Sequence, residues 1–135
     1  MPRYVILTHD HPFPHWDLML ESGDALATWR LLDAPAAGRV CRAEKLPDHR
    51  SMYLDYEGPV SGGRGVVARW DHGTYDSLDP GPPRLLRLHG SRDLASAELA
   101  SGIEGVSWTF GGFERETANL TNATSSESAE SPPGP

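Results

Sequence analysis

Short apolar segments separated by glycine and proline constrain the fold of this chain most strongly. The sequence holds 14 glycines and 12 prolines, and up to about residue 116 they fall between apolar runs that are too short for long helices. This pattern predicts many short strands joined by turns. Strands are expected over 4–9, 15–21, 25–32, 51–56, 65–70, 84–89 and 106–110. One segment, 93–101, is rich in Ala, Leu and Glu and is expected to be helical.

So many short strands would expose unpaired edges unless the sheet closes on itself. We therefore expect a mainly β protein, a small closed or half-closed β-barrel with short helical connections. Its 135 residues suit one domain. Near Thr117 the composition changes to Ser, Thr, Glu and Pro, with too few apolar side chains to offset the entropy of ordering. A barrel domain over 1–116 and a disordered tail over 117–135 are predicted.

Composition also narrows the cellular setting. Cys41 is the single cysteine, so no internal disulfide can form. No apolar stretch approaches the roughly 18–20 residues that span a bilayer, and the first residues lack the apolar run of a secretory signal. A cytoplasmic protein without membrane contact is expected. The net charge of −7 argues against extended nucleic-acid contact, which draws on many Lys and Arg side chains.

Three polar residues near the N-terminus have the chemistry of a metal site. In a strand over 15–21, alternation places His15 and Asp17 on one face and the apolar even-numbered residues on the other. His9 ends the preceding strand, one short connection away. Two histidines and a carboxylate with open positions suit Mn, Fe or Zn. Polar residues at a barrel rim would give the same pattern, and spacing alone leaves both interpretations open.

A second group follows near the middle of the chain. In the strand expected over 51–56, Tyr53 shares one face with Ser51 and Asp55, and His49, two residues before that strand, could lie on the same side. Beside a metal, such a pair can donate hydrogen bonds to phosphate oxygens and a proton to a leaving group. Without a metal, His49 is more simply a surface histidine. Asp10 adjoins His9 and could orient an imidazole ring.

Several short motifs follow one another through the first 76 residues. In their order and spacing they resemble the 3′-phosphoesterase domain of bacterial DNA ligase D, over 3–76 and more weakly through 86–90 and 107–110. The motifs are His9-Asp10, His15-Trp16-Asp17, Asp48-His49, Tyr53, Tyr56-Glu57-Gly58 and Trp70-Asp71-His72-Gly73-Thr74-Tyr75.

The resemblance implies a manganese-dependent enzyme that trims the 3′ ends of DNA or of RNA-primed strands. Such an enzyme removes a terminal ribonucleotide and then the remaining 3′-phosphate, leaving a 3′-hydroxyl for separate ligase or polymerase proteins. His9, His15 and Asp17 match the family's metal ligands. His49 and Tyr53 match the pair that contacts the scissile phosphate. The alternative is a non-catalytic homologue that binds nucleic-acid ends or a protein partner.

The sequence departs from the family pattern on the phosphate side. Met19 stands where the family has an arginine facing the phosphate, and a thioether cannot donate a hydrogen bond to it. Pro47 replaces a glutamate and Cys41 replaces a further arginine. Arg42 or Arg39 after a register shift, and Arg64 in a glycine-rich loop, are the candidates for replacing the lost phosphate contacts.

The net charge of each part of the chain is compatible with an enzyme that acts on one strand end. Residues 114–135 hold four Glu against one Arg, so the remaining chain carries a net charge of only −4. An enzyme that handles one terminal phosphate through a metal ion does not need a long basic face. Positive charge is then expected to gather around the metal, supplied by Arg39, Arg42, Arg50 and Arg64.

Overall fold

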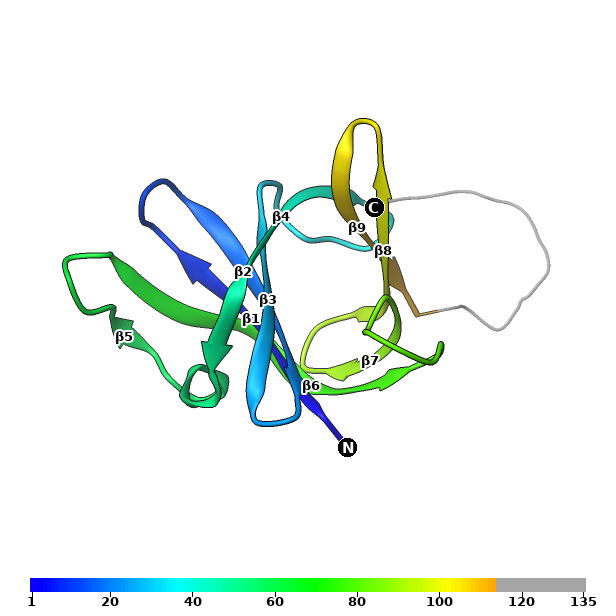
Figure 1. The fold of residues 1–135 in the computed structure, drawn as a ribbon, viewed down its shortest axis with the longest axis horizontal. Coiled ribbons are helices and arrows are strands. Elements are labelled where there is room, and N and C mark those ends of the chain that lie inside the picture. Colours follow the sequence, from blue (N-terminus) through cyan, green and yellow to red (C-terminus); the bar gives the residue numbers. More distant parts are fainter. Residues whose placement is uncertain (114–135) are drawn as a thin grey trace.

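A computed structural model describes residues 1–113, which form a closed antiparallel β-barrel (Figure 1). Eight strands follow one another around it in the order β1-β2-β3-β4-β9-β8-β7-β6, and β6 pairs with β1 to close the ring. A short ninth strand, β5, extends the sheet beyond β6. The strands are β1 (Arg3–His9), β2 (His15–Ser22), β3 (Ala25–Leu31), β4 (Val40–Arg50), β5 (Gly58–Pro59), β6 (Val66–Ser77), β7 (Leu85–Gly90), β8 (Leu94–Gly102) and β9 (Gly105–Gly112).

The prediction of a mainly β closed barrel is confirmed. Within residues 1–113 the helical content is one 3₁₀ turn, η1 (Ser51–Leu54). The same part of the chain contains no helix long and apolar enough to cross a membrane. The predicted tail over 117–135 lies outside the described residues.

The predicted helix over 93–101 is wrong, because this segment forms β8. Strand β8 pairs with β9 from Leu94 opposite Gly112 to Gly102 opposite Gly105. A register shift between Leu94 and Ser96 inserts one extra residue into β8. Leu94 and Ala97 are both buried although they lie three residues apart, so the bulge imitates helical spacing. A nine-residue helix would also be marginal by itself, whereas β8 completes the ring between β7 and β9.

The predicted strand over 51–56 is also wrong. Residues Ser51–Leu54 form η1, and Leu54 is its buried residue. The strand in this region comes earlier, as β4, and 40–50 is not among the predicted strands. Its charged residues and Pro47 conceal the pattern. One extra β4 residue lies between the pairs Thr28–Leu46 and Leu26–His49, which gives a bulge where Pro47 is tolerated.

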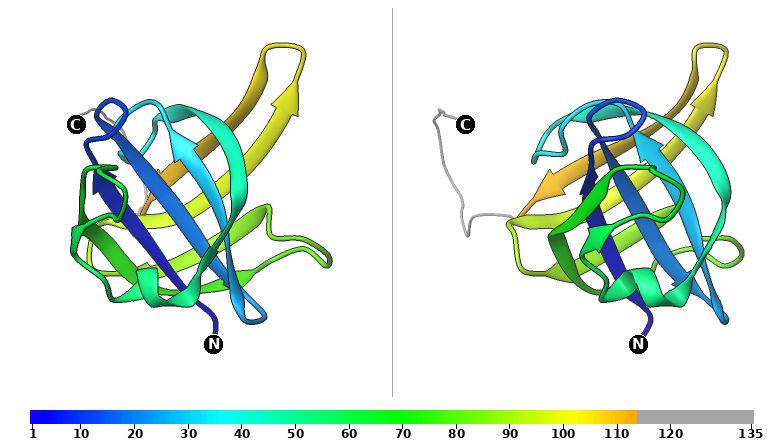
Figure 2. Two further views of the ribbon diagram at one scale, coloured as in Figure 1. Left: turned by 60° about the vertical axis from the view of Figure 1, so that its left-hand side comes forward. Right: turned by 90° about the vertical axis from the view of Figure 1, so that its left-hand side faces the viewer.

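Apolar side chains form two separate clusters. The larger cluster fills the barrel interior and draws on all eight barrel strands, with Trp108, Tyr4 and Phe110 among its largest buried side chains. The smaller cluster lies on the outer face of β1 to β3, where the chain from the end of β4 through η1 and β5 crosses in front of these strands (Figure 2, right). Its buried members are Val5, Leu7, Met19, Leu26, Leu54 and Val67. Strands β1 and β2 are therefore covered on both faces, and the outer cluster supports the floor of the candidate site.

Asp71, from the Trp70–Tyr75 motif, has a structural position. Its buried carboxylate accepts a hydrogen bond from the Tyr4 hydroxyl at 2.7 Å and from the backbone N–H groups of Ser91 and Arg92 at 3.0 and 3.1 Å. Burial and the adjacent carboxylate raise the pKa of Tyr4, so this hydroxyl remains a donor. These contacts hold β1 to β6 and to the turn after β7. Asp71 does not line the cavity beside His9, His15 and Asp17.

Candidate metal centre

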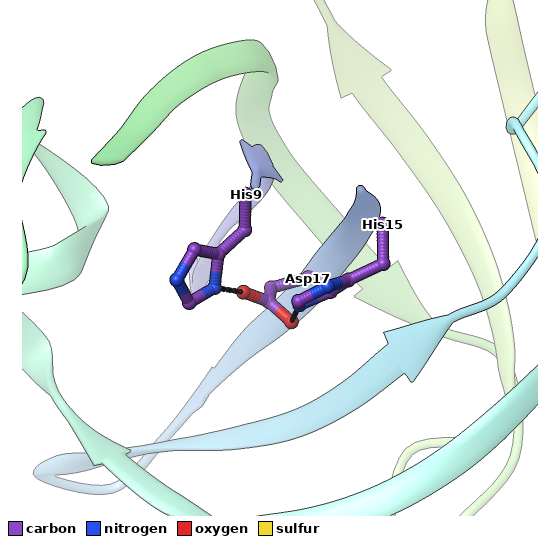
Figure 3. A group of neighbouring side chains, drawn as sticks. All are labelled: His9, His15 and Asp17. Atoms are coloured by element: carbon purple, nitrogen blue, oxygen red, sulfur yellow. Dashed lines mark hydrogen bonds and ion pairs between the residues drawn. The ribbon is translucent and has the colours of Figure 1, made fainter. Parts of the chain in front are cut away.

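His9, His15 and Asp17 converge on the outer face of the barrel. One possible ligand atom from each lies within 4.8 Å of the others. The convergence follows from strand register, because His9 ends β1 directly opposite His15 at the start of β2. Asp17 lies two residues further along β2, on the same face. In Figure 3 the carboxylate of Asp17 lies between the two imidazole rings.

Backbone carbonyls fix the orientation of both rings. The Nδ1 of His15 donates to the carbonyl oxygen of Phe13 at 2.7 Å, and the Nε2 of His9 donates to that of Arg64 at 2.8 Å. A carbonyl can only accept, so these two nitrogens carry hydrogens. In the neutral rings, the Nε2 of His15 and the Nδ1 of His9 are therefore lone-pair nitrogens, the form that binds a metal.

Both lone-pair nitrogens face the same carboxylate. The Nε2 of His15 lies 3.0 Å from Oδ1 of Asp17, and the Nδ1 of His9 lies 2.9 Å from Oδ2. The His15–Asp17 contact is short but not aligned as a hydrogen bond, and both atoms are buried without another partner in residues 1–113. Acceptors this close require a positive charge beside them, either a proton or a cation. Two imidazole nitrogens and one carboxylate suit a divalent transition metal.

The buried pair shifts the pKa values of its members in opposite directions. Burial lowers the pKa of His15, but the Asp17 carboxylate and the Phe13 carbonyl outweigh it, and the pKa is raised overall. Burial raises the pKa of Asp17, yet the two imidazoles lower it overall. Each shift thus favours the pair of a protonated His15 and an ionised Asp17, and a metal ion at Nε2 would compete with that proton.

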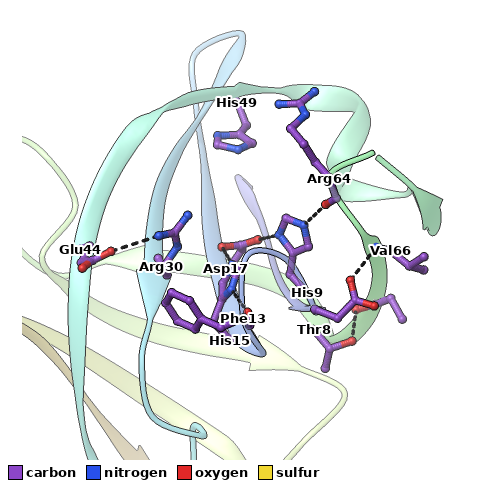
Figure 4. Close-up of polar contacts among 12 residues, drawn as sticks. Thr8, His9, Phe13, His15, Asp17, Arg30, Glu44, His49, Arg64 and Val66 are labelled. Atoms are coloured by element: carbon purple, nitrogen blue, oxygen red, sulfur yellow. Dashed lines mark hydrogen bonds and ion pairs between the residues drawn. The ribbon is translucent and has the colours of Figure 1, made fainter. Parts of the chain in front are cut away.

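An open cavity of about 470 Å³ extends from this triad (Figure 4). Its floor is the outer face of β1 to β3, and its opposite wall comes from the end of β4, η1 and the loop before β6. Three arginines and four histidines line it, against two aspartates. A chain with a net charge of −7 therefore concentrates basic groups here. Arg50 and Arg64 line the cavity as expected, whereas Arg39 lines a different surface pocket.

The structure brings His49 and Tyr53 to the same cavity. The Nδ1 of His49 donates to the carbonyl oxygen of Pro47 at 2.9 Å, which leaves its Nε2 free for the cavity. The His49 and Tyr53 rings meet edge to face, with centroids 5.8 Å apart, and Tyr53 packs in the same way on Tyr56. Their shared side arises from the bulge at Pro47 and the η1 turn, and not from the expected strand.

Two of the arginines expected to replace the lost phosphate contacts, Arg42 and Arg64, have different positions. Arg42 does not reach the cavity: its guanidinium forms two hydrogen bonds with Asp33, at 3.0 and 2.9 Å. The adjacent Cys41 is buried in the barrel interior, where burial raises the pKa of its thiol to about 11. Arg64 does line the cavity, and its guanidinium binds Ser61.

Asp10 contributes through the loop before β6. Its carboxylate accepts a hydrogen bond from the backbone N–H of Val66 at 2.8 Å, and within residues 1–113 it forms no hydrogen bond with an imidazole. Arg64, two residues before Val66, supplies the carbonyl that orients His9. Asp10 is therefore placed to orient His9 indirectly, by holding that loop in position.

Gly65 lets the loop approach Asp10, and its replacement should disturb the metal centre. Its φ of +84° disfavours a side chain, and a Cβ there would lie 2.3 Å from Oδ1 of Asp10 and 2.6 Å from Cβ of His11. We expect Gly65→Ala to displace the Arg64 carbonyl from His9 and to weaken manganese binding about tenfold. Calorimetric titration measures the change. Gly63→Ala is the matched control: its φ is +68° but its Cβ meets no atom within 4 Å, so equal losses in both variants would contradict this role for the contact.

Arg30 also lines the cavity and is not among the predicted site residues. Arg30 on β3 is the direct cross-strand partner of Asp17 on β2. Directly opposed residues share a face, so its side chain lies on the same side as the triad. Alternation in 25–32 places Arg30 on the face opposite Trp29 and Leu31, but only the β2–β3 register places it beside Asp17.

A family model for the DNA Ligase D 3′-phosphoesterase domain matches residues 7–127. The chain belongs to this family. The multifunctional non-homologous end joining protein LigD of Pseudomonas aeruginosa is 30% identical over 103 residues, covering 73% of this chain and 12% of that protein. The corresponding DNA repair protein of Mycobacterium tuberculosis is 33% identical over 101 residues, covering 66% of this chain and 13% of that protein. The chain thus spans a small part of the length of these relatives.

Met19 stands where the resemblance to the ligase D 3′-phosphoesterase domain predicts an arginine that faces the phosphate. Its side chain is 1% exposed, lines the cavity and belongs to the outer apolar cluster. A methionine here stabilises the floor by packing but offers no donor to a phosphate. His9, His15 and Asp17 match the pattern that the resemblance predicts, whereas Met19 departs from it.

Proposed function

We propose that this chain is a manganese-dependent phosphoesterase that removes a 3′-phosphate or a terminal 3′-ribonucleotide from DNA or RNA-primed strands. One observation carries the proposal. Two imidazoles, each oriented by a backbone carbonyl, turn their remaining nitrogens toward the carboxylate of Asp17. Membership of the ligase D 3′-phosphoesterase domain family supports a role in processing DNA ends.

The residues of the cavity divide the chemistry between them. His9, His15 and Asp17 would hold the metal, and a bound divalent cation neutralises phosphate charge and lowers the pKa of a coordinated water. His49 through Nε2 and Tyr53 through its hydroxyl would donate to phosphate oxygens, or give a proton to the leaving group. Both face the cavity that contains the triad.

The charge distribution supports work on one end rather than along a duplex. Basic side chains gather in the cavity while the chain as a whole is acidic. Extended duplex binding would need many phosphate contacts over a wide surface. The product would be a 3′-hydroxyl end, which a polymerase or ligase requires, so we propose such proteins as partners.

An end-processing assay tests the proposal. The purified chain is incubated with Mn²⁺ and with duplexes that end in a 3′-phosphate or in a single 3′-ribonucleotide. Phosphate release and a mobility shift of the labelled strand are the expected results, and EDTA should abolish both. Unchanged ends with Mn²⁺ present would contradict catalysis. That result would favour the alternative, a homologue that binds nucleic-acid ends or a protein partner, for which buried Met19 is the specific supporting observation.

Acidification should weaken manganese binding, because the proton and the metal compete for Nε2 of His15. The raised pKa of His15 makes this competition begin above the ordinary value of 6.5, and the lowered pKa of Asp17 keeps the carboxylate ionised through the same range. Below the pKa of His15 we expect the affinity to fall about tenfold per pH unit for one displaced proton. Calorimetric titrations between pH 5 and 8 measure the slope, and a pH-independent affinity would contradict binding at His15.

The stability of the metal-free fold should depend on pH in the opposite direction to the manganese affinity. Folding raises the pKa of His15, so His15 stabilises the fold fully at pH values below its pKa in the unfolded chain. This contribution is lost as the pH rises through its pKa in the folded protein. For Asp17, the contribution is present above its unfolded pKa and is lost as the solution is acidified. The His15–Asp17 pair therefore stabilises the metal-free protein most at mildly acidic pH, where manganese binds more weakly.

A further inference from the structure

Arg30 lies beside the metal centre at a place set by strand pairing. It is the direct cross-strand neighbour of Asp17, and it lines the same cavity. Figure 4 shows its guanidinium close to the carboxylate of Asp17, on the side away from His9. The position belongs to the rigid β2–β3 sheet and not to a loop, which favours precise placement of a functional group.

The hydrogen bonding of Arg30 is incomplete. Its Nε is buried without a partner among residues 1–113. Its Nη1 donates to Glu44 at 3.3 Å, but the Glu44 side chain is 52% exposed, so water competes for this contact. The guanidinium carbon lies 5.5 Å from the centroid of the Phe13 ring, which restricts the side chain without accepting a conventional hydrogen bond. Nη2 donates to no group among residues 1–113, so an anion in the cavity would supply an acceptor for it.

The other arginines of the cavity are less suited to this task. Arg64 uses Nε and Nη2 on Ser61. Arg50 is exposed to solvent, where its charge is well screened. Arg30 is partly buried, so its charge acts at short range with less screening.

The positive charge of Arg30 repels a cation bound by His9, His15 and Asp17. Arg30 lies directly opposite Asp17 in the β2–β3 pair and lines the same cavity as His15. A metal ion held by His15 and Asp17 would meet the same repulsion. A phosphate placed between the metal and the guanidinium would remove the conflict, because its oxygens attract both. Planar guanidinium groups suit this role, since two parallel N–H groups match two phosphate oxygens.

We propose that Arg30 binds the terminal 3′-phosphate of the DNA strand and holds it against the His9–His15–Asp17 centre. The nature of the ligand rests on the proposed function of the cavity. Met19, two residues from Asp17, has no donor for this phosphate, and Arg30 supplies the cation from the neighbouring strand.

A binding comparison isolates the phosphate group. A fluorescent DNA hairpin carries either a 3′-hydroxyl or a 3′-methylenephosphonate, whose C–P bond resists hydrolysis. Anisotropy gives the affinity of the full chain for each hairpin, with and without Mn²⁺. The wild type should prefer the phosphonate, and Arg30→Met should reduce that preference about 10- to 100-fold, as expected for a lost charge-assisted hydrogen bond. Arg30→Lys keeps the charge without the planar fork of N–H groups. Its preference for the phosphonate should lie between those of the wild type and Arg30→Met.

Arg87→Met provides the matched control, since Arg87 is an exposed arginine on β7 and lies outside the cavity. It should keep the wild-type preference. Thermal unfolding confirms that each variant is folded, and Arg30→Lys serves alone if Arg30→Met does not fold. A preference unchanged in either Arg30 variant, or absent from the wild type, overturns the role of Arg30. A separate titration with Mn²⁺ alone tests the metal centre, so failure of the metal proposal is distinguishable from failure of this one.

Discussion

His15→Ala should abolish manganese-dependent processing of 3′ ends. The substitution removes the buried nitrogen that faces Asp17 and leaves one imidazole with one carboxylate to hold the metal. Metal ions contribute several kcal/mol to stabilising a phosphoryl transition state, so we expect activity to fall about 10³-fold. Manganese affinity should fall with it. Both are measured on the same preparation, by 3′-phosphate release and by calorimetric titration.

His89→Ala is the control for this experiment. His89 is an exposed histidine on β7 that pairs with Asp76 at 2.9 Å, and it does not line the cavity. It should retain wild-type activity and metal affinity. Since His15 is buried, thermal unfolding must show that His15→Ala still folds. A folded His15→Ala variant that processes ends at the wild-type rate would refute the assignment of the metal centre.

His49→Ala should separate catalysis from metal binding. Removing a positioned donor or general acid lowers rates by about 10²-fold or more, while His9, His15 and Asp17 keep their contacts. We therefore expect kcat to fall about 10²-fold and the manganese affinity to stay unchanged. Steady-state kinetics on a 3′-phosphate duplex, together with a manganese titration, measures both quantities.

The tyrosines of the cavity wall extend this test. Tyr53→Phe removes only the hydroxyl and should cost about tenfold in rate, the smaller loss expected for one hydrogen bond to a charged group. Tyr56→Phe is matched to it, because the Tyr56 hydroxyl donates to the carbonyl of Pro59 and Tyr56 does not line the cavity. Equal losses in the two variants would mean that the tyrosines act through packing. A loss of manganese affinity in His49→Ala would place His49 in the metal centre instead.

Local periodicity was sufficient for the parts of the fold that have a single buried face or a short connection. Alternation in β2 placed His15 and Asp17 on one face, and the short turn from β1 brought His9 beside them. Closure of the barrel followed from the number of short strands. His9, His15 and Asp17 are close in sequence, so alternation and one short turn bring them together, whereas closure pairs β1 with the distant β6.

Bulges account for the two strands, β8 and β4, that periodicity missed. An extra residue in β8 brings Leu94 and Ala97 to one side and imitates a helix. A second bulge, near Pro47, conceals β4. Arg30 could not be selected, because its closeness to Asp17 is a property of the β2–β3 register and not of spacing along one strand. Arg42 was an expected phosphate contact, but Asp33 holds it elsewhere.

The short distance along the chain between the proposed ligands has a consequence for folding. His9, His15 and Asp17 lie within nine residues of one hairpin, and closing so small a loop costs little chain entropy. His49, Tyr53 and Arg64 return to the same cavity only after the chain has passed through β3 and β4. The metal site can therefore begin to form while most of the barrel is still unfolded, whereas the phosphate side depends on the long-range pairing of the complete sheet. Recognition of a strand end would then be a stricter test of correct folding than manganese binding, which needs only the hairpin and the Arg64 carbonyl.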